Sequence, residues 1–234
     1  MLSSVVTGTS TFTRDLPYGW DTLVENIVDP SHIPFAHHGL QGTREDAIPI
    51  NLTVTSEGQH GFEFDFADRT MGRRRAGSGS FKAPYIVAYQ AEYGPKQTAT
   101  AKQLAKEASK PPKTFNLTVV CLPTRPGWSR IIIFVTLPKG FVFAALPAWL
   151  LHLFPNRFLD SDLAFLHFQE QTAQERGYAP NNPKYFMPAQ VDRGITALRN
   201  WIGRHATVLR PRCLRPCMSG SSSCRGGSST RRTV

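Results

Sequence analysis

Long uninterrupted apolar runs are missing from this chain of 234 residues. The most apolar stretch, residues 131–154, is broken by Pro138, Lys139, Gly140 and Pro147. A membrane-spanning helix needs about 20 consecutive, mostly apolar residues. The stretch therefore predicts a strand, a turn and an amphipathic, membrane-facing segment. The beginning of the sequence also lacks the basic and apolar regions of a signal peptide, so we expect neither a transit peptide nor a transmembrane helix in this chain.

Cysteine is scarce, with four residues in the chain. Cys121 lies in the strand-like run LTVVCLP, and we expect it to be a buried, apolar thiol. Cys213, Cys217 and Cys224 all lie in an arginine-rich tail. The role of these three is not indicated by the sequence.

Acidic residues are missing from residues 203–234, which hold seven arginines and so supply +7 of the formal net charge of +10. The rest of the chain is only mildly basic. A nucleic-acid-binding domain presents its basic side chains on a folded surface, and no such pattern precedes the tail. We therefore predict no nucleic-acid partner, one folded domain over residues 1–205, and a low-complexity tail that is disordered over residues 206–234.

The most informative stretch that is present is VENIVDPSHIPFAHHG, which contains Glu25, Asp29, His32 and His37. Two imidazoles and a carboxylate with open positions suit a catalytic non-haem Fe(II), because the open positions admit O2 and substrate. We expect a helical turn and a bend at Pro34 to aim both histidines at one point. Asp29 is expected on the same helical face as His32, where its carboxylate can accept the imidazole N–H.

Alternatives remain open for several of these residues. His38 could replace His37, although the spacing of four intervening residues after His32 favours His37. Glu25 and Asp29 could form an ordinary solvated helix face. We favour the interpretation that both acids lie beside the histidines, because their spacing keeps them there.

The pattern Asp-x2-His-x4-His, preceded by a carboxylate or amide four residues earlier, resembles the mononuclear iron site of Rieske-type oxygenases. The longer run RDLPYGWDTLVENIVDPSHIPFAHHGL is similar to the pheophorbide a oxygenase branch of that family. The resemblance covers residues 12–203 and is weakest across residues 70–110. It implies a catalytic domain that oxygenates a chlorophyll-type tetrapyrrole with O2. Since the branch includes translocon-associated members, the alternative is a non-catalytic paralogue in an envelope-membrane assembly.

The resemblance also implies a third iron ligand, a carboxylate far downstream. The segment FLDSDLAFLHFQEQTAQERG resembles the family's Asp-x3-Leu-x2-Gln arrangement, with Asp162, Leu166 and Gln169 at the matching positions. Asp160 is the competing choice and could be the helix N-cap. The implied site then consists of His32, His37 and Asp162 as ligands of a mononuclear Fe(II), with Asp29 and Glu25 as catalytic residues beside them.

The largest departure from the family concerns its iron–sulfur cluster. A Rieske [2Fe–2S] cluster needs a Cys-x-His and a Cys-x2-His pair, and neither occurs in the chain. The resemblance implies that electrons from a ferredoxin-type donor arrive through a cluster outside this sequence or on a neighbouring subunit, with Asp29 on their route. It further implies a chloroplast envelope or thylakoid location, a peripheral membrane contact, and a homotrimer as one arrangement of subunits.

Alternating apolar and polar residues predict antiparallel strands through the middle of the chain. We expect strands over residues 51–69 with a turn at Gly58, over 81–94, and over 115–138 with a turn at Arg125–Gly127. A polar insertion or short helix is expected over residues 92–113. Helices are expected over residues 20–40, 162–177 and 189–205, the last one burying Val191, Ile195, Leu198 and Ile202. This order predicts an α+β fold, with a helix-grip-like antiparallel sheet flanked by helices.

Overall fold

A single antiparallel sheet organises the chain in the computed structural model, which describes residues 9–109, 113–136, 147–177 and 185–205. Its seven strands lie in the order β1-β7-β6-β5-β4-β3-β2. The strands are β1 (Thr9–Leu16), β2 (Asn51–Gly58), β3 (Gly61–Thr70), β4 (Arg73–Lys82), β5 (Ile86–Lys96), β6 (Lys113–Arg125) and β7 (Trp128–Thr136). The helices are α1 (Trp20–Val28), η1 (Pro30–His32), α2 (Ile33–Ala36), η2 (Arg44–Asp46), α3 (Ala101–Ala108), α4 (Ala148–Glu175) and α5 (Arg193–His205).

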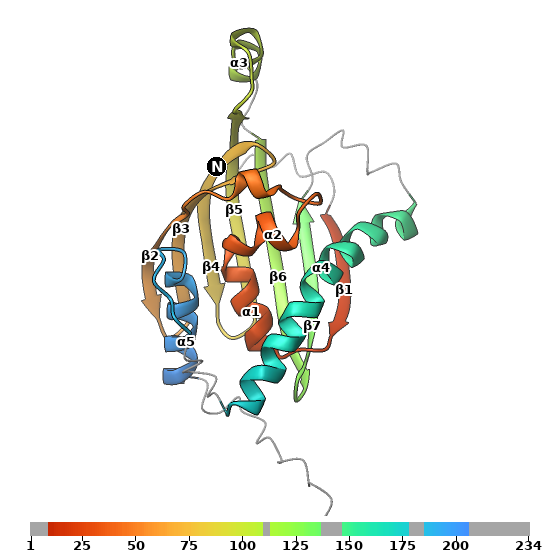
Figure 1. Ribbon diagram of the computed structural model, residues 1–234, viewed down its shortest axis with the longest axis vertical. Coiled ribbons are helices and arrows are strands. Elements are labelled where there is room, and N and C mark those ends of the chain that lie inside the picture. Colours follow the sequence, from red (N-terminus) through yellow and green to blue (C-terminus); the bar gives the residue numbers. More distant parts are fainter. Residues whose placement is uncertain (1–8, 110–112, 137–146, 178–184, 206–234) are drawn as a thin grey trace, which may run out of the picture.

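The long helices cover one face of this sheet (Figure 1). Helix α1 packs on the central strands β5, β6 and β7, α5 packs on β2 and β3, and α4 crosses toward β1 at the other edge. Strand β3 buries every second residue, which turns Phe62, Phe64 and Phe66 toward the core. The predicted α+β, helix-grip-like fold is therefore confirmed.

The hairpin β6–β7 matches the expectation from the sequence, while α5 begins at Arg193 and not at residue 189, so that Val191 precedes it. Residues Arg125 and Trp128 pair across the predicted turn, and Cys121 is fully buried. Helix α3 occupies the polar insertion and extends away from the sheet (Figure 1). The four residues expected on the apolar face of the last helix are all buried: Val191, Ile195, Leu198 and Ile202.

The strand expected over residues 81–94 is β5, but it begins only at Ile86, because residues 81–82 end β4 and residues 83–85 form the turn between the two strands. Sequence patterning missed β4 because RRRAGSGSFK has little apolar alternation. Two glycines of β4 are required because neighbouring strands leave no space for a side chain. A Cβ at Gly79 would come within 2.3 Å of the Phe64 ring, and one at Gly77 within 2.1 Å of the Gln90 carbonyl oxygen. Close contact with neighbouring strands, and not turn formation, explains these glycines. Strand β1 was also not predicted.

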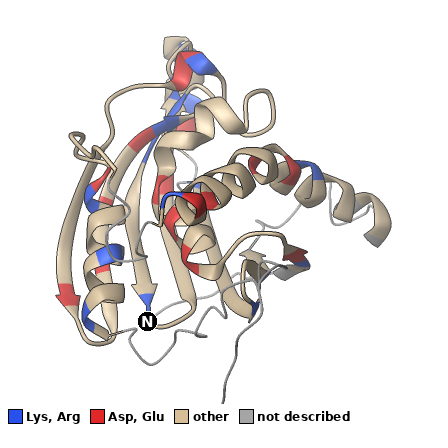
Figure 2. Cartoon of the chain, turned by 60° about the horizontal axis from the view of Figure 1, so that its bottom comes forward, with Lys and Arg blue, Asp and Glu red and all other residues tan. Residues whose placement is uncertain are grey.

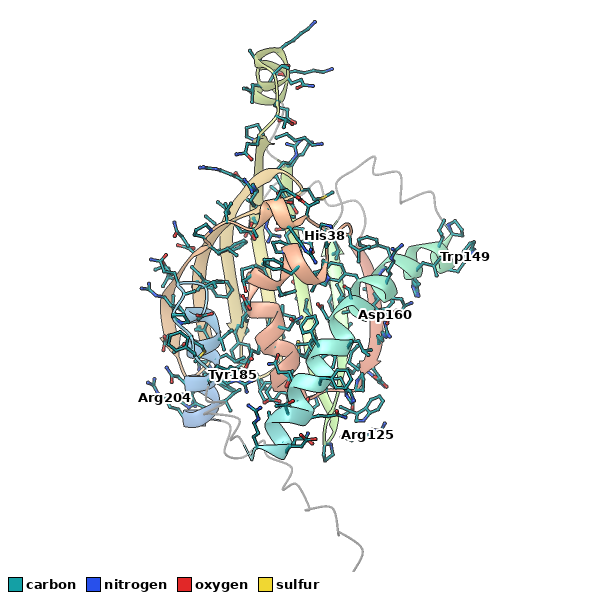
Figure 3. All side chains as sticks on the ribbon, viewed as in Figure 1. His38, Arg125, Trp149, Asp160, Tyr185 and Arg204 are labelled. Atoms are coloured by element: carbon teal, nitrogen blue, oxygen red, sulfur yellow. The ribbon has the colours of Figure 1, made fainter. Side chains whose placement is uncertain are left out.

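Helix α4 also differs from the expectation. It begins at Ala148, whereas the sequence predicted a helix over residues 162–177. Asp160 is therefore in the middle of a helix and is not an N-cap. The first turns of α4 carry the exposed side chains Trp149, Leu153 and Phe154. Trp149 lies at the end that projects past the sheet (Figure 3).

No helix in the described ranges combines the length and the apolar character needed to cross a membrane. In the view of Figure 2, basic and acidic residues are interspersed over the strands and helices. The expected turn after residue 136 and the expected disordered tail after residue 205 lie outside the described residues, as do Cys213, Cys217 and Cys224.

Candidate metal centre

The two candidate histidines are presented by a break in the chain directly after α1. The helix ends at Val28, and Asp29 is extended, with φ −107° and ψ 98°. A residue before proline avoids helical geometry, so Pro30 ends α1 and starts η1 as its first residue. The bend expected at Pro34 therefore occurs earlier, and Pro34 lies in the first turn of α2.

Asp29 supports His32 through a different atom than expected. Its carboxylate accepts hydrogen bonds from the Ser31 backbone N–H and hydroxyl, both at 2.9 Å, and so caps η1. The Asp29 backbone carbonyl oxygen lies 2.5 Å from His32 Nδ1. A carbonyl can only accept, so His32 carries its proton on Nδ1 and leaves the Nε2 lone pair free.

His37 is held by α4. Its Nδ1 lies 2.8 Å from the Ser161 hydroxyl, and its ring stacks on Phe158 with centroids 3.6 Å apart. The imidazole is 1% exposed. Burial and, to a smaller extent, the neighbouring His32 lower the pKa of His37 to about 3. The ring is therefore neutral at physiological pH.

Asp162 supplies a buried carboxylate to the same place, one helical turn after Phe158. Its Oδ2 accepts a hydrogen bond from the Asn26 amide at 3.2 Å. Its Oδ1 is buried and has no hydrogen-bond partner among the described residues. Burial raises the pKa of Asp162 to about 7, although the Asn26 hydrogen bond opposes the shift.

The three side chains converge on one point. His32 Nε2 lies 3.3 Å from His37 Nε2, and His37 Nε2 lies 3.4 Å from Asp162 Oδ2. One ligand atom from each residue falls within 4.8 Å of the others. Metal–ligand bonds of about 2.0–2.2 Å place adjacent ligand atoms roughly 3.0–3.6 Å apart. The His32–His37 and His37–Asp162 separations match this range, while the 4.8 Å bound on the whole set exceeds it, so the side chains would draw slightly closer around a metal ion.

The electrostatics of the cluster also fit a cation. Two neutral imidazoles with lone pairs on Nε2 lie beside the buried Asp162 carboxylate, whose Oδ2 is 3.4 Å from His37 Nε2 and whose Oδ1 has no hydrogen-bond partner among the described residues. In the described part of the chain, no Lys or Arg forms an ion pair with Asp162. A divalent metal ion would satisfy all three groups, and the combination of two histidines and one carboxylate is typical of non-haem Fe(II) sites.

Glu25, in contrast, does not face the histidines. It is buried and accepts from Arg199 of α5 at 2.5 Å from the guanidinium Nε. It also accepts from the Gln169 amide at 3.3 Å. Burial raises the pKa of Glu25, while the Arg199 guanidinium opposes that rise. The expectation that Glu25 lies beside His32 and His37 is therefore not supported by its contacts.

Both competing candidates for the ligands point elsewhere. His38 is exposed, and its Nδ1 accepts from the Arg44 backbone N–H at 3.2 Å. Asp160 is 59% exposed and pairs with Arg14 of β1 at 2.6 Å. Figure 3 labels both residues, His38 near α2 and Asp160 on α4. The structure thus brings together His37 and Asp162 with His32 and leaves these alternatives on the surface.

Three residues of the cluster were missed from the sequence: Asn26, Phe158 and Ser161. Asn26 is next to Glu25, which the motif had singled out, and its amide takes the position beside Asp162. Ser161 precedes the candidate ligand, and Phe158 is one turn earlier on α4. The sequence places Asn26 and Ser161 next to candidate site residues, which was the available signal for them. That position does not indicate where their side chains point.

Comparison with known proteins places the chain among oxygenases. Residues 81–179 match the pheophorbide a oxygenase family. Pheophorbide a oxygenase of Arabidopsis thaliana is 31% identical over 217 residues, covering 84% of this chain and 37% of that protein. The protochlorophyllide-dependent translocon component 52 of Arabidopsis thaliana is 28% identical, covering 82% and 39%. Flavonoid 8-hydroxylase 2 of Ocimum basilicum is 29% identical, covering 82% and 37%. The chain thus spans less than two fifths of the length of these relatives, all of which are chloroplastic.

Solved structures share the fold at low sequence identity. A variant of NdmA from Pseudomonas putida CBB5 with caffeine has a TM-score of 0.57 and 14% identity, with 84% of this chain and 50% of that chain covered. Dicamba monooxygenase bound to 3,6-dichlorosalicylic acid also has a TM-score of 0.57, with 11% identity and coverage of 84% and 60%. Identities this low establish the architecture alone.

Proposed function

The chain belongs to the pheophorbide a oxygenase-like branch of the Rieske-type non-haem iron oxygenases, and we propose that it is the terminal oxygenase domain of a monooxygenase. The observation that supports this most is the convergence of His32, His37 and Asp162, whose ligand atoms lie within 4.8 Å of one another. In this proposal, the three side chains hold one mononuclear Fe(II) at the face of the sheet that the helices cover.

When bound, the iron would supply a place where O2 can bind and take up electrons next to a substrate. The residues of the chain do the positioning. His32 and His37 offer Nε2 because their Nδ1 protons are engaged by the Asp29 carbonyl and the Ser161 hydroxyl. Asn26 holds one oxygen of Asp162, which fixes the plane of the carboxylate.

We propose a chlorophyll-type tetrapyrrole as the substrate. The proposal rests on the match to the pheophorbide a oxygenase family and on relatives of that name in two plants. Flavonoid 8-hydroxylase 2, a relative of similar identity, makes a flavonoid the substrate class to compare in every assay.

The electrons are proposed to come from a ferredoxin-type donor through a Rieske cluster outside this sequence, because the chain has neither Cys-x-His nor Cys-x2-His. Asp29 lies directly between α1 and His32, and we keep it as a residue on that route. A homotrimer is one arrangement that would place another subunit's cluster near this iron.

We propose that the protein acts in the chloroplast in peripheral contact with a membrane. The relatives named above are chloroplastic. The exposed Trp149, Leu153 and Phe154 at the projecting end of α4 support a membrane-surface contact, since aromatic and apolar side chains on one helix end partition into the interface.

The second candidate function is a non-catalytic component of an envelope-membrane assembly. One observation favours it: the match to a translocon component over 82% of the chain. The buried donor set argues for the oxygenase, because a purely structural domain gains nothing from an unsatisfied carboxylate oxygen.

The experiment that separates the two functions supplies the missing cluster. The chain is fused to the Rieske domain of pheophorbide a oxygenase and assayed with ferredoxin, its reductase and O2, using pheophorbide a, chlorophyllide a and a flavone as substrates. We expect an oxygenated tetrapyrrole, detected by mass spectrometry with 18O2. Asp162→Ala should abolish product formation, while Asp160→Ala, two residues away on the surface of α4, should retain it.

An iron-loaded fusion with an intact Rieske spectrum that oxygenates none of the substrates would favour the assembly component. Product formation by the Asp162→Ala variant would contradict the assigned ligand set.

A further inference from the structure

We propose that Ser161 is a positioning residue whose hydroxyl selects the tautomer of His37 and thereby keeps Nε2 available to a metal ion. The inference rests on the proposed function of the site and adds to it a residue that decides between two arrangements of the histidine pair. The contacts of Ser161, His37 and His32 carry the argument.

The direction of the hydrogen bonds around Ser161 follows from one backbone group. Its hydroxyl oxygen lies 2.6 Å from the Phe158 carbonyl oxygen, which has no proton to give. The hydroxyl proton of Ser161 is therefore donated to Phe158. Toward His37, 2.8 Å away, the same oxygen can only accept, so His37 must carry its proton on Nδ1.

A competing arrangement is available to His37. Its Nε2 lies 3.3 Å from His32 Nε2, and the Asp29 carbonyl already fixes the His32 proton on Nδ1. If the His37 proton moved to Nε2, it would be donated to His32 Nε2 or to Asp162 Oδ2, which lies 3.4 Å from His37 Nε2. Either hydrogen bond would remove the Nε2 lone pair of His37 and would engage a second donor atom that a metal ion needs. Free histidine favours this Nε2–H tautomer, so the protein must select against it.

The His37 ring is shielded from water. His37 is 1% exposed, and Phe158 covers one face of its ring. Phe158, Ser161 and the ligand Asp162 all come from one turn of α4. Arg14 ties this part of α4 to β1 through the Asn156 carbonyl at 3.1 Å and through Asp160. The helix therefore positions the carboxylate and the histidine tautomer together.

The test measures the tautomer directly in metal-free, 15N-labelled protein near pH 8. Long-range 1H–15N correlation spectra distinguish protonation of Nδ1 from protonation of Nε2. We expect Nδ1–H for His37 in the wild type and in Ser161→Thr, which keeps a hydroxyl. In Ser161→Ala we expect the Nε2–H form, with affinity for Zn2+ or Co2+ lowered by about tenfold or more, as for other residues that orient metal ligands.

Ser129→Ala is the matched control. Like the half-buried Ser161, the fully buried Ser129 donates its hydroxyl to a backbone carbonyl, that of Tyr18 at 2.8 Å, but it contacts neither histidine. This variant should lose stability without a change in the His37 tautomer. Thermal unfolding of all variants separates a general loss of packing from the specific effect.

An Nε2–H tautomer in the wild type, or an Nδ1–H tautomer together with wild-type metal affinity in folded Ser161→Ala, would overturn the inference. If Ser161→Ala does not fold, the wild-type tautomer and the Thr variant decide it in the same way. A wild type with the Nδ1–H tautomer that binds no metal would instead contradict the proposed function of the site and leave the tautomer selection standing.

Discussion

Two buried polar clusters lie near α1, and the negative charge of their carboxylates is balanced in different ways. In the first, Glu25 and Asp21 of α1 meet the Arg199 guanidinium of α5, so the cluster contains its own cation. In the second, His32, His37 and Asp162 bring together lone pairs and a carboxylate without any Lys or Arg partner among the described residues. We infer that the first cluster joins helices, whereas the second is a donor set for a cation supplied from solution.

The difference also appears in the hydrogen bonds. Glu25 accepts from Arg199 on one oxygen and from Gln169 on the other. Asp162 has one oxygen bonded to Asn26 and one that is unsatisfied. An unsatisfied buried oxygen costs roughly 1–3 kcal/mol, and more when it is charged. A bound cation would offset this cost, because it would satisfy the free oxygen of Asp162.

The largest effect is expected from breaking the first cluster. Arg199→Met leaves Glu25 buried without its cation, and removal of one partner from a buried ion pair costs about 3–5 kcal/mol. Urea denaturation of the metal-free protein should show this loss. The double variant Glu25→Gln with Arg199→Met should recover much of it, because no unpaired charge remains.

The matched control for that prediction is an exposed pair of the same chemistry. Arg130 and Asp15 lie 2.6 Å apart, with both side chains 47% exposed. Arg130→Met should therefore lower the free energy of unfolding far less than Arg199→Met does, because water screens the exposed pair. Equal losses from Arg199→Met and Arg130→Met would show that the first cluster does not join the helices.

The second prediction concerns pH and the second cluster. Burial raises the pKa of Asp162 to about 7 in the folded chain, above its ordinary value of 3.8. The folded state then binds a proton that the unfolded state has lost, so the metal-free protein loses stability as the pH rises from about 4 to 7. Asp162→Asn removes this dependence. The advantage of the variant should grow by up to about 1.4 kcal/mol per pH unit over that range and then stay level.

The comparison is made by urea denaturation in a chelator at pH 5 and pH 8, and His37 contributes equally to both proteins. Burial lowers the pKa of His37 to about 3, so its own effect is a loss of stability as the pH falls below 6.5. A difference between Asp162→Asn and wild type that is the same at both pH values would contradict the raised pKa of Asp162.

The smallest effect is expected at Asp29. Its carboxylate caps η1 through Ser31, while the contact to His32 comes from its backbone. Asp29→Ala should lower the free energy of unfolding by about 1 kcal/mol, as for the loss of a helix cap, and should leave metal binding in place. Calorimetric metal titration checks the second part. If the variant bound no metal, the Asp29 side chain and not its carbonyl would hold His32.

The sequence indicated the three residues that converge, because two of them lie close together in the chain and the third was chosen by resemblance to a family. His32 and His37 are five residues apart, and Asp162 was selected over Asp160 by the Asp-x3-Leu-x2-Gln resemblance. Neither spacing nor resemblance could predict where the Glu25 side chain points. Neighbouring helix residues point about 100° apart, so the same α1 sends Glu25 toward α5 and Asn26 toward α4.

What was missed in the fold has a similar cause. Strand β4 is encoded by glycines that fit against Phe64 of β3 and against the backbone of β5, which are tertiary contacts. The hydrogen bond between His37 and Ser161 joins residues 124 positions apart. Periodicity and caps predict local structure, but these contacts exist only after the sheet and α4 are assembled.

The most direct test of the central claim is an anaerobic Fe(II) titration of the purified chain, followed by metal analysis and thermal unfolding. We predict one tightly bound iron per chain and a raised melting temperature, since a ligand that binds only the folded state stabilises it. His37→Ala and Asp162→Ala should lose both effects, while His38→Ala and Asp160→Ala should retain them. A wild type without bound iron, or full binding by the Asp162→Ala variant, would contradict the account.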